Sequence, residues 1–92
     1  MTTNSKNKNH LNQKSKTILD VRSPIEFQGG HVEGSLNIPL QEIMNKIDQI
    51  KKLPKPIILC CASGMRSHQA TILLQNQGID CQNGGSWLDI NF

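Results

Sequence analysis

The stretch IILCCASGMRSHQATILLQNQG, residues 57–78, decides the fold of this 92-residue chain. It opens with five consecutive apolar residues after a proline-containing turn. Such continuous hydrophobicity over strand length is typical of a strand buried on both faces, at the centre of a parallel sheet. A loop of small residues follows, and then a helix from Ser67 that Gly78 ends, with Ala70, Leu73, Leu74 and Gln77 on one face. The stretch therefore predicts a strand, a loop and a helix on a parallel sheet.

The remaining sequence continues this alternation. Ser23 at the N-cap, Pro24 at the first helical position and Glu26 three residues after the cap predict a short helix that Gly29 ends. Strands are predicted at 17–22, 35–38 and 79–83, a helix at 40–50, a turn at the following glycine pair and a half-helical segment at 86–90. We expect an α/β fold in which right-handed crossovers place helices on both faces of a parallel sheet.

The helix predicted at 40–50 is amphipathic. Its apolar residues recur at helical spacing, and polar residues occupy the other side. We expect the apolar side chains to form core rather than a cofactor site: Leu40, Ile43, Met44, Ile47 and Ile50.

Charge divides the chain into two parts, 1–16 and 17–92. Residues 1–16 hold four of the ten basic residues and no acidic one, so the remaining part has a net charge of −1 although the chain has +3. The first part is polar and has only Leu11 to bury, which is typical of a disordered tail. It lacks interleaved aromatic residues and an amphipathic face, so we expect neither a nucleic-acid partner nor a membrane partner. Residues 17–92 are expected to form one domain.

The three cysteines are too few and too close together for a disulfide framework. An odd number of thiols with an adjacent pair favours a reducing compartment. No apolar stretch reaches the length of a signal peptide or a membrane span. We therefore expect a cytoplasmic protein.

The adjacent cysteines are predicted to differ in role. Alternation along the strand sends Cys60 and Cys61 to opposite faces, and only Cys61 stands at the mouth of the loop. There, loop amides, the start of the helix and Arg66 would each stabilise a thiolate and lower its pKa. We expect Cys61 to be the nucleophile and Cys60 an inert buried thiol.

Several motifs in this order resemble the single-domain rhodaneses, thiosulfate sulfurtransferase-type modules. They are the sequences DVR at 20–22, GH at 30–31 with Gly34, NIP at 37–39 and CASGMRS at 61–67. The likeness spans residues 18–90, and in length and ending it is greatest to the small bacterial phage-shock rhodaneses. It implies a rhodanese-like sheet, whose usual first strand is here short or missing because a polar tail precedes residue 17.

The resemblance implies a ping-pong reaction through a persulfide on Cys61. Sulfane sulfur would pass from thiosulfate or a persulfide donor to cyanide or a thiol, with a protein as a possible acceptor. Arg66 would hold the anionic donor together with the loop residues Ala62, Ser63, Gly64, Met65 and Ser67. Asp20 and Arg22 are expected to support the loop, with Glu26 and Glu33 as candidate partners of Arg22. No metal or other cofactor is implied.

Two alternatives stay open at this point. The first is a binding or sulfur-relay module that accepts sulfur only from a protein partner. The second is a phosphatase or arsenate reductase. Cysteine phosphatases resemble C-x5-R, whereas only four residues separate Cys61 from Arg66, and this smaller ring suits a single sulfur atom better than a tetrahedral phosphate.

Four further residues receive structural predictions. His31 is expected to have a structural role beside its glycines, His68 a surface position and Trp87 a packing role. Cys81 is expected to be a buried or rim thiol rather than a resolving cysteine for Cys61.

Overall fold

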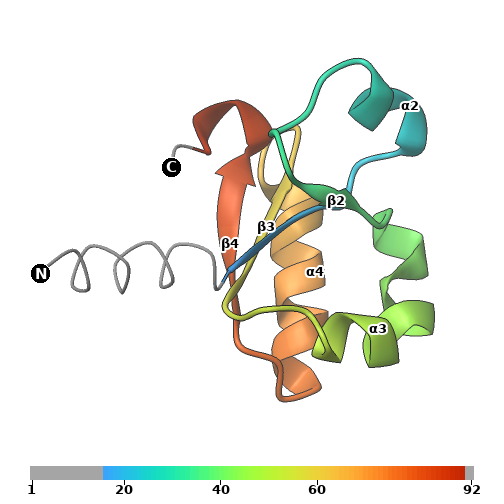
Figure 1. Cartoon of the computed structure of the whole chain (residues 1–92), viewed down its shortest axis with the longest axis vertical. Helices are drawn as coiled ribbons and strands as arrows, with labels where there is room; N and C mark the ends of the chain where they lie inside the picture. Colours follow the sequence, from blue (N-terminus) through green and yellow to red (C-terminus); the bar gives the residue numbers. More distant parts are fainter. Residues whose placement is uncertain (1–15, 91–92) are drawn as a thin grey trace, which may run out of the picture.

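The computed structural model describes residues 16–90, which form a four-stranded sheet with helices packed against it (Figure 1). The strands are β1 (Thr17–Asp20), β2 (Leu36–Asn37), β3 (Ile57–Cys61) and β4 (Cys81–Ser86). They are all parallel, in the order β2-β1-β3-β4. The predicted α/β fold with a parallel sheet is confirmed. No helix among the described residues is long and apolar enough to cross a membrane.

Strand β3 is the buried centre that its sequence predicts. It pairs with β1 on one side and with β4 on the other, and all five of its residues are buried. Its alternating side chains enter two separate cores. Leu59 and Cys61 belong to the larger one, whereas Ile58 and Cys60 belong to the smaller one. The two cysteines therefore do point to opposite faces.

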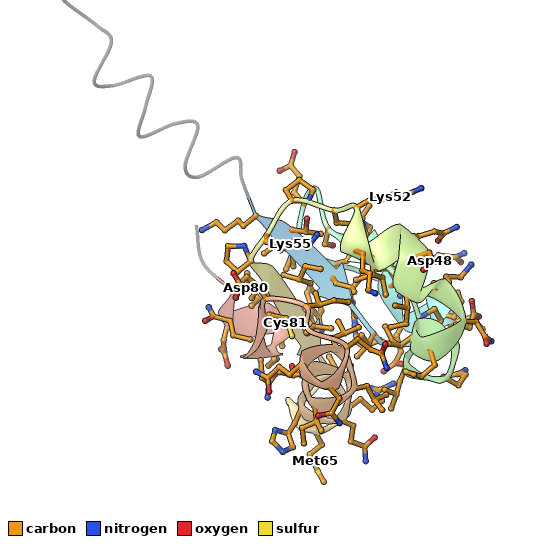
Figure 2. The ribbon with its side chains drawn as sticks, turned by 90° about the horizontal axis from the view of Figure 1, so that it is seen from below. Asp48, Lys52, Lys55, Met65, Asp80 and Cys81 are labelled. Carbon is orange, nitrogen blue, oxygen red and sulfur yellow. The ribbon has the colours of Figure 1, made fainter. Side chains whose placement is uncertain are left out.

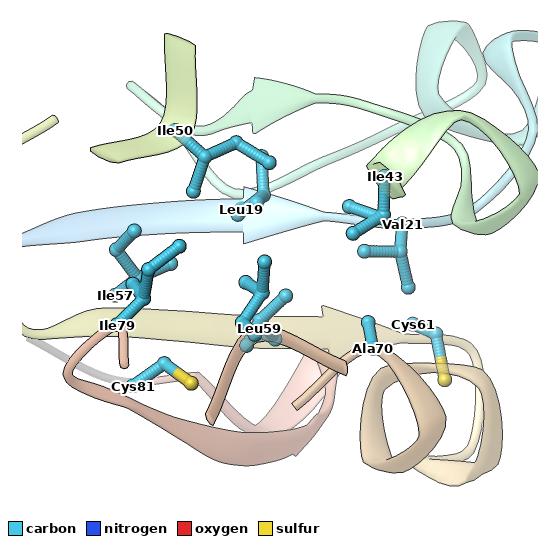
Figure 3. Packing of buried hydrophobic residues seen from close by; sticks show 11 residues of the cluster. Leu19, Val21, Ile43, Ile50, Ile57, Leu59, Cys61, Ala70, Ile79 and Cys81 are labelled. Atoms are coloured by element: carbon cyan, nitrogen blue, oxygen red, sulfur yellow. The ribbon is translucent and has the colours of Figure 1, made fainter. Parts of the chain in front are cut away.

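The larger core lies between the sheet and the helices α4 (Met65–Asn76), η1 (Leu40–Lys46) and α3 (Ile47–Lys51). Figure 3 shows Ile43 and Ile50 facing Leu19 and Val21 of the β1 region, while Ala70 of α4 packs beside Cys61. On the other face a smaller core is covered by Val32, Trp87 and Ile90. Trp87 begins the short 3₁₀ helix η2 (Trp87–Asp89), so the predicted packing role of this residue holds.

The predicted capping box is present at helix α2 (Pro24–Gln28). The Ser23 hydroxyl accepts a hydrogen bond from the Glu26 amide, and the Glu26 carboxylate accepts one from the Ser23 amide. This local pairing satisfies donors that the first helical turn leaves free. It fixes α2 directly after β1, at the carboxyl end of the sheet (Figure 1).

The prediction of a single α-helix at 40–50 was wrong. The chain forms the 3₁₀ helix η1 first and turns into α3 at Ile47. With three residues per turn, positions 40 and 43 lie in line, and the next residue is rotated out of the face. Ile43 and Ile50 are fully buried as expected, but Met44 is 49% exposed and does not belong to the core.

The ends of two other elements also differ from the prediction. Helix α4 begins at Met65 rather than Ser67, so the loop between β3 and α4 contains only residues 62–64. The glycine pair predicted as a turn lies inside β4. A Cβ atom on Gly84 would lie 2.7 Å from Ile90 Cδ1 and 2.8 Å from Ile58 Cγ2. Glycine is therefore required here by close packing within the sheet rather than by a turn.

The tail predicted at 1–16 lies outside the described residues, apart from Lys16. Within residues 16–90, the first strand is β1, which begins at Thr17.

Replacing Gly84 with alanine tests this close packing. The methyl group overlaps two side chains, so we expect Gly84→Ala to lower the free energy of unfolding by about 1–3 kcal/mol, measured by urea denaturation. Gly29→Ala is the matched control, because a Cβ at Gly29 meets only ordinary contacts of 3.5 Å or more. Equal stability of the two variants would contradict the packing argument.

Candidate active site

The loop from β3 to α4 bends sharply at Gly64. This residue caps α4 with φ of 104°, in the left-handed region that favours glycine, and a Cβ there would lie 3.3 Å from the Gly85 backbone. Its carbonyl accepts the amide of His68 in the first turn of α4. The bend brings the start of α4 back over the end of β3, where Cys61 is the last strand residue.

Two amides and one hydroxyl group approach the sulfur of Cys61. The Gly64 amide lies 3.0 Å from Sγ, the Ser67 amide 3.4 Å and the Ser67 hydroxyl 3.5 Å. Burial acts to raise the pKa of Cys61, but hydrogen bonds from the Ser67 hydroxyl and from the amides of Ser67, Gly64 and Ser63 outweigh it. They lower the pKa to about 7. A large fraction of the thiol is therefore ionised at neutral pH, and the thiolate is the nucleophilic form.

Cys60 has the opposite electrostatic environment. It is fully buried in the smaller core, and burial, with Asp20 nearby, raises its pKa to about 12. Cys60 is thus un-ionised at neutral pH, in agreement with the prediction that it is an inert buried thiol.

Cys81 lies far from Cys61 along the sheet. It pairs with Ile57 at the start of β3, whereas Cys61 is the last residue of that strand (Figure 3). Four residues of extended strand correspond to about 13 Å, well beyond the Cα separation that a disulfide allows. Cys81 is buried, burial raises its pKa, and its thiol donates to the Thr71 carbonyl. A buried thiol is what the sequence predicts here.

Arg66, the predicted anion-binding residue, is paired with a carboxylate. Its Nη1 and Nη2 atoms lie 2.8 and 3.0 Å from the two carboxylate oxygens of Glu26. Hydrogen bonds from Arg66 and from the Ser23 backbone lower the pKa of Glu26 to about 2, despite the opposing effect of burial. Glu26 is therefore a partner of Arg66, and not of Arg22 as the sequence suggested.

Arg22 instead forms a buried ion pair with Asp20. Its Nε lies 2.9 Å from Asp20 Oδ1, and its Nη2 lies 2.7 Å from Asp20 Oδ2. The guanidinium also donates to the Gly30 carbonyl at 2.7 Å and stacks 4.5 Å from the centre of the Trp87 ring. Neither Glu26 nor Glu33 is the partner of this arginine. The pair fixes the chain that follows β1, and with it the position of α2.

The segments that follow β1, β2 and β3 meet at one edge of the sheet. The side-chain amide of Asn37 donates to the carbonyls of Asp20 and Arg22 at 3.0 and 2.9 Å. This ties the end of β2 to the end of β1, while β3 ends next to them at Cys61. Ligands of parallel α/β sheets bind at this edge.

Asn83 is the residue that sequence reasoning missed. Its Oδ1 accepts the Ser67 hydroxyl at 2.6 Å and the Gly85 amide at 3.0 Å, and its Nδ2 donates to the Gly64 carbonyl at 3.1 Å. Because the Ser67 hydroxyl has only one proton, this short bond competes with its 3.5 Å contact to Cys61 Sγ. It therefore links β4 to both residues that donate to Cys61. The sequence analysis ended the last strand at residue 83 and placed a turn after it. In the structure the strand continues through Gly84, and this places Asn83 beside the loop.

Access to Cys61 is restricted. The side chain has no exposed surface, although Ala62, Ser63 and Met65 of the covering segment are exposed. The Met65 side chain points away from the body of the protein (Figure 2), and it borders a cavity of about 440 Å³ together with Ser63, Gly64 and Asn83. A larger cavity, of about 520 Å³, lies at the opposite end of β1, beside Thr17 and Pro54. A donor can therefore reach Sγ only if this covering segment moves.

Two histidines, His31 and His68, lie among the described residues. His31 stacks on Phe27 at 3.7 Å between ring centres, and its Nδ1 lies 2.7 Å from the Phe27 carbonyl. His68 is exposed on α4. Both positions match the structural and surface roles predicted for them. Among residues 16–90, no group of three or more candidate ligands could hold a metal ion.

Removing the Ser67 hydroxyl tests the account of the Cys61 pKa. We expect Ser67→Ala to raise this pKa from about 7 toward the value of an ordinary thiol, about 8.5. The measurement is the rate of iodoacetamide alkylation at Cys61 against pH, located by peptide mass. Thr71→Val is the control, because its hydroxyl bonds to the Ser67 carbonyl and not to sulfur. An unchanged profile in Ser67→Ala would show that the amides alone set the pKa.

Comparisons with known proteins agree with this geometry. The family model for the rhodanese-like domain matches residues 3–87. Thiosulfate sulfurtransferase PspE of Escherichia coli K12 is 34% identical over 74 residues, which are 78% of this chain and 71% of that protein. A solved structure described as a rhodanese with anions from E. coli superposes with a TM-score of 0.74 at 32% identity, covering 84% of this chain and 93% of that one.

The match to a second relative covers only part of that protein. The uncharacterized protein YqhL of Bacillus subtilis is 39% identical over 61 residues, which are 66% of this chain and 48% of that protein, so the match spans about half of its length. The family model nevertheless covers most of this chain, and the parallel sheet agrees with the solved relatives. The chain therefore belongs to the rhodanese-like domain family.

Proposed function

We propose that this protein transfers sulfane sulfur through a persulfide on Cys61. The observation that carries the proposal is the set of donors around Sγ: a buried thiol at the end of a central strand, with amides of Gly64 and Ser67 directed at it and a pKa of about 7. This arrangement supports a nucleophile that is ionised at neutral pH. The same donors suit the anionic persulfide that would form there.

The first half-reaction is a displacement at sulfur. The Cys61 thiolate attacks the outer sulfur of thiosulfate, a new S–S bond forms, and the original S–S bond breaks with its electron pair leaving on sulfite. In the second half-reaction an acceptor, cyanide or a thiolate, attacks the terminal sulfur. The S–S bond to Cys61 breaks, so the acceptor leaves with the sulfur as thiocyanate or a persulfide, and the Cys61 thiolate is regenerated. No proton acceptor besides solvent is needed, since each nucleophile is already an anion.

The residues of the loop would have distinct roles in this reaction. The amides from Ala62 to Ser67 would stabilise the negative charge on the terminal sulfur. Gly64 permits the bend that directs them inward. Arg66 would provide the positive charge at the mouth, and the pair Asp20–Arg22 would hold the neighbouring chain in place. We place the reaction in the cytoplasm, where the three unpaired cysteines would stay reduced.

A sulfur relay that accepts sulfur only from a protein partner is the second candidate. The observation that favours it is the absence of exposed surface on Cys61: in this case a docked partner protein would move the covering segment before sulfur is transferred. Phosphatase activity has less support, because the short loop encloses a space suited to sulfur.

The decisive experiment combines an activity assay with intact mass measurement. We expect the wild type to gain one sulfur atom from thiosulfate and to form thiocyanate when cyanide is added. Cys61→Ser should lose both properties, because it removes the nucleophile. Cys60→Ala should retain them, since that thiol is un-ionised in the smaller core.

Each other outcome excludes one candidate. Full activity of Cys61→Ser would overturn the proposal. Sulfur gain from a protein persulfide but not from thiosulfate would establish the relay. Hydrolysis of an aryl phosphate without sulfur gain would indicate the oxyanion enzyme.

A further inference from the structure

We propose that Glu26 is a specificity-determining residue of this site, which disfavours sulfur donors of double negative charge by holding Arg66 in a bidentate ion pair. The inference rests on the proposed function of Cys61, and it specifies which class of sulfur donor the site favours. Donors with a single negative charge, such as monoanionic thiosulfonates, would be favoured relative to thiosulfate.

The ion pair lies within electrostatic reach of the nucleophile, because the hydrogen bonds to Glu26 and, to a smaller extent, the charge of Cys61 raise the pKa of Arg66. Arg66 lies in the first turn of α4, five residues after Cys61, and both of its Nη atoms are engaged by Glu26 at 2.8 and 3.0 Å. The Arg66 and Glu26 side chains are 38% and 37% exposed, so the pair faces solvent at the edge of the loop. An anion that approaches Arg66 meets the carboxylate at the same time.

Glu26 is itself held in place. Its Oε1 atom accepts hydrogen bonds from the Ser23 amide and the Ser23 hydroxyl, each at 3.0 Å, in addition to the bond from Arg66. These bonds keep the carboxylate in the capping box of α2. The low pKa of Glu26 keeps it charged throughout the neutral range. An anion that binds Arg66 is therefore placed beside a carboxylate that stays charged and in position.

The result is a site in which the Cys61 thiolate carries the only unbalanced charge among the residues named here. Arg66 and Glu26 cancel each other, as do Asp20 and Arg22 behind them. The loop residues from Ala62 to Met65 carry no charge. Since the Coulomb energy of a donor is proportional to its charge, a dianion gains twice as much free energy from an uncompensated Arg66 as a monoanion does. Neutralisation of Arg66 thus removes more affinity for thiosulfate than for a monoanion.

The test is Glu26→Gln with two donors of similar chemistry. Thiosulfate carries two negative charges and methanethiosulfonate carries one, and both deliver an outer sulfur by displacement at an S–S bond. Glutamine can still form a capping box, so α2 is retained while the charge is removed. The readout is the second-order rate of persulfide formation on Cys61 at low ionic strength, followed by intact mass.

We expect Glu26→Gln to accelerate the reaction with methanethiosulfonate about twofold and the reaction with thiosulfate about fourfold, as for a partly exposed ion pair. The difference should shrink in high salt, because salt screens exposed charges. Ser23→Ala is the matched control. It weakens the capping box but keeps the carboxylate, so it should change both rates by the same factor.

Two results separate failure of this inference from failure of the proposed function. If both donors transfer sulfur to the wild type and Glu26→Gln changes their rates equally or lowers both, Glu26 is only a structural residue and the inference is overturned. If neither donor, nor a protein persulfide, transfers sulfur to Cys61 of the wild type, the proposed function fails and this inference fails with it.

Discussion

The structure depends on burying β3 on both faces. Its five side chains, Ile57 to Cys61, are all buried and the first four are apolar, so the strand is stable only with a neighbouring strand on each side and a core on each face. Pairing with β1 and β4 meets the first need. The helices α4, η1 and α3 cover one face, and Val32, Trp87 and Ile90 cover the other. Once β3 is central, its last residue lies at the middle of the sheet edge where parallel strands end.

This position produces the chemistry of the site. Cys61 is buried because it belongs to β3, and burial alone would raise its pKa. The turn at Gly64 brings amides of the loop and of the first turn of α4 to within 3.4 Å of Sγ. The balance favours the thiolate, whereas for Cys60, one residue earlier, burial and the nearby Asp20 raise the pKa and no hydrogen bond to the sulfur opposes them. Two adjacent cysteines therefore differ in pKa because their side chains leave the strand on opposite sides.

Several local features could be predicted because they arise from neighbouring residues. The capping box at Ser23 and Glu26, the strand 57–61 and the asymmetry of the two cysteines follow from short-range pattern and strand alternation. Where local geometry was subtler, prediction was wrong. The apolar spacing at 40–50 suited an α-helix, but the chain forms a 3₁₀ helix first, which exposes Met44. The glycine pair suited a turn, but contact of Gly84 with Ile58 and Ile90 retains it in the sheet.

The sequence by itself determined the order of strands and helices, the family resemblance and the cysteine that ends the central strand, because each depends on residues close together in the chain. Only the tertiary structure decided which charges pair at the site. Glu26 and Arg66 are 40 positions apart, and Asn83 reaches Ser67 across 16. Such contacts depend on how elements pack, which short-range pattern does not encode. Glu26 could have paired with either arginine by its sequence position, and the tertiary fold, which brings α2 within reach of the start of α4, selected Arg66.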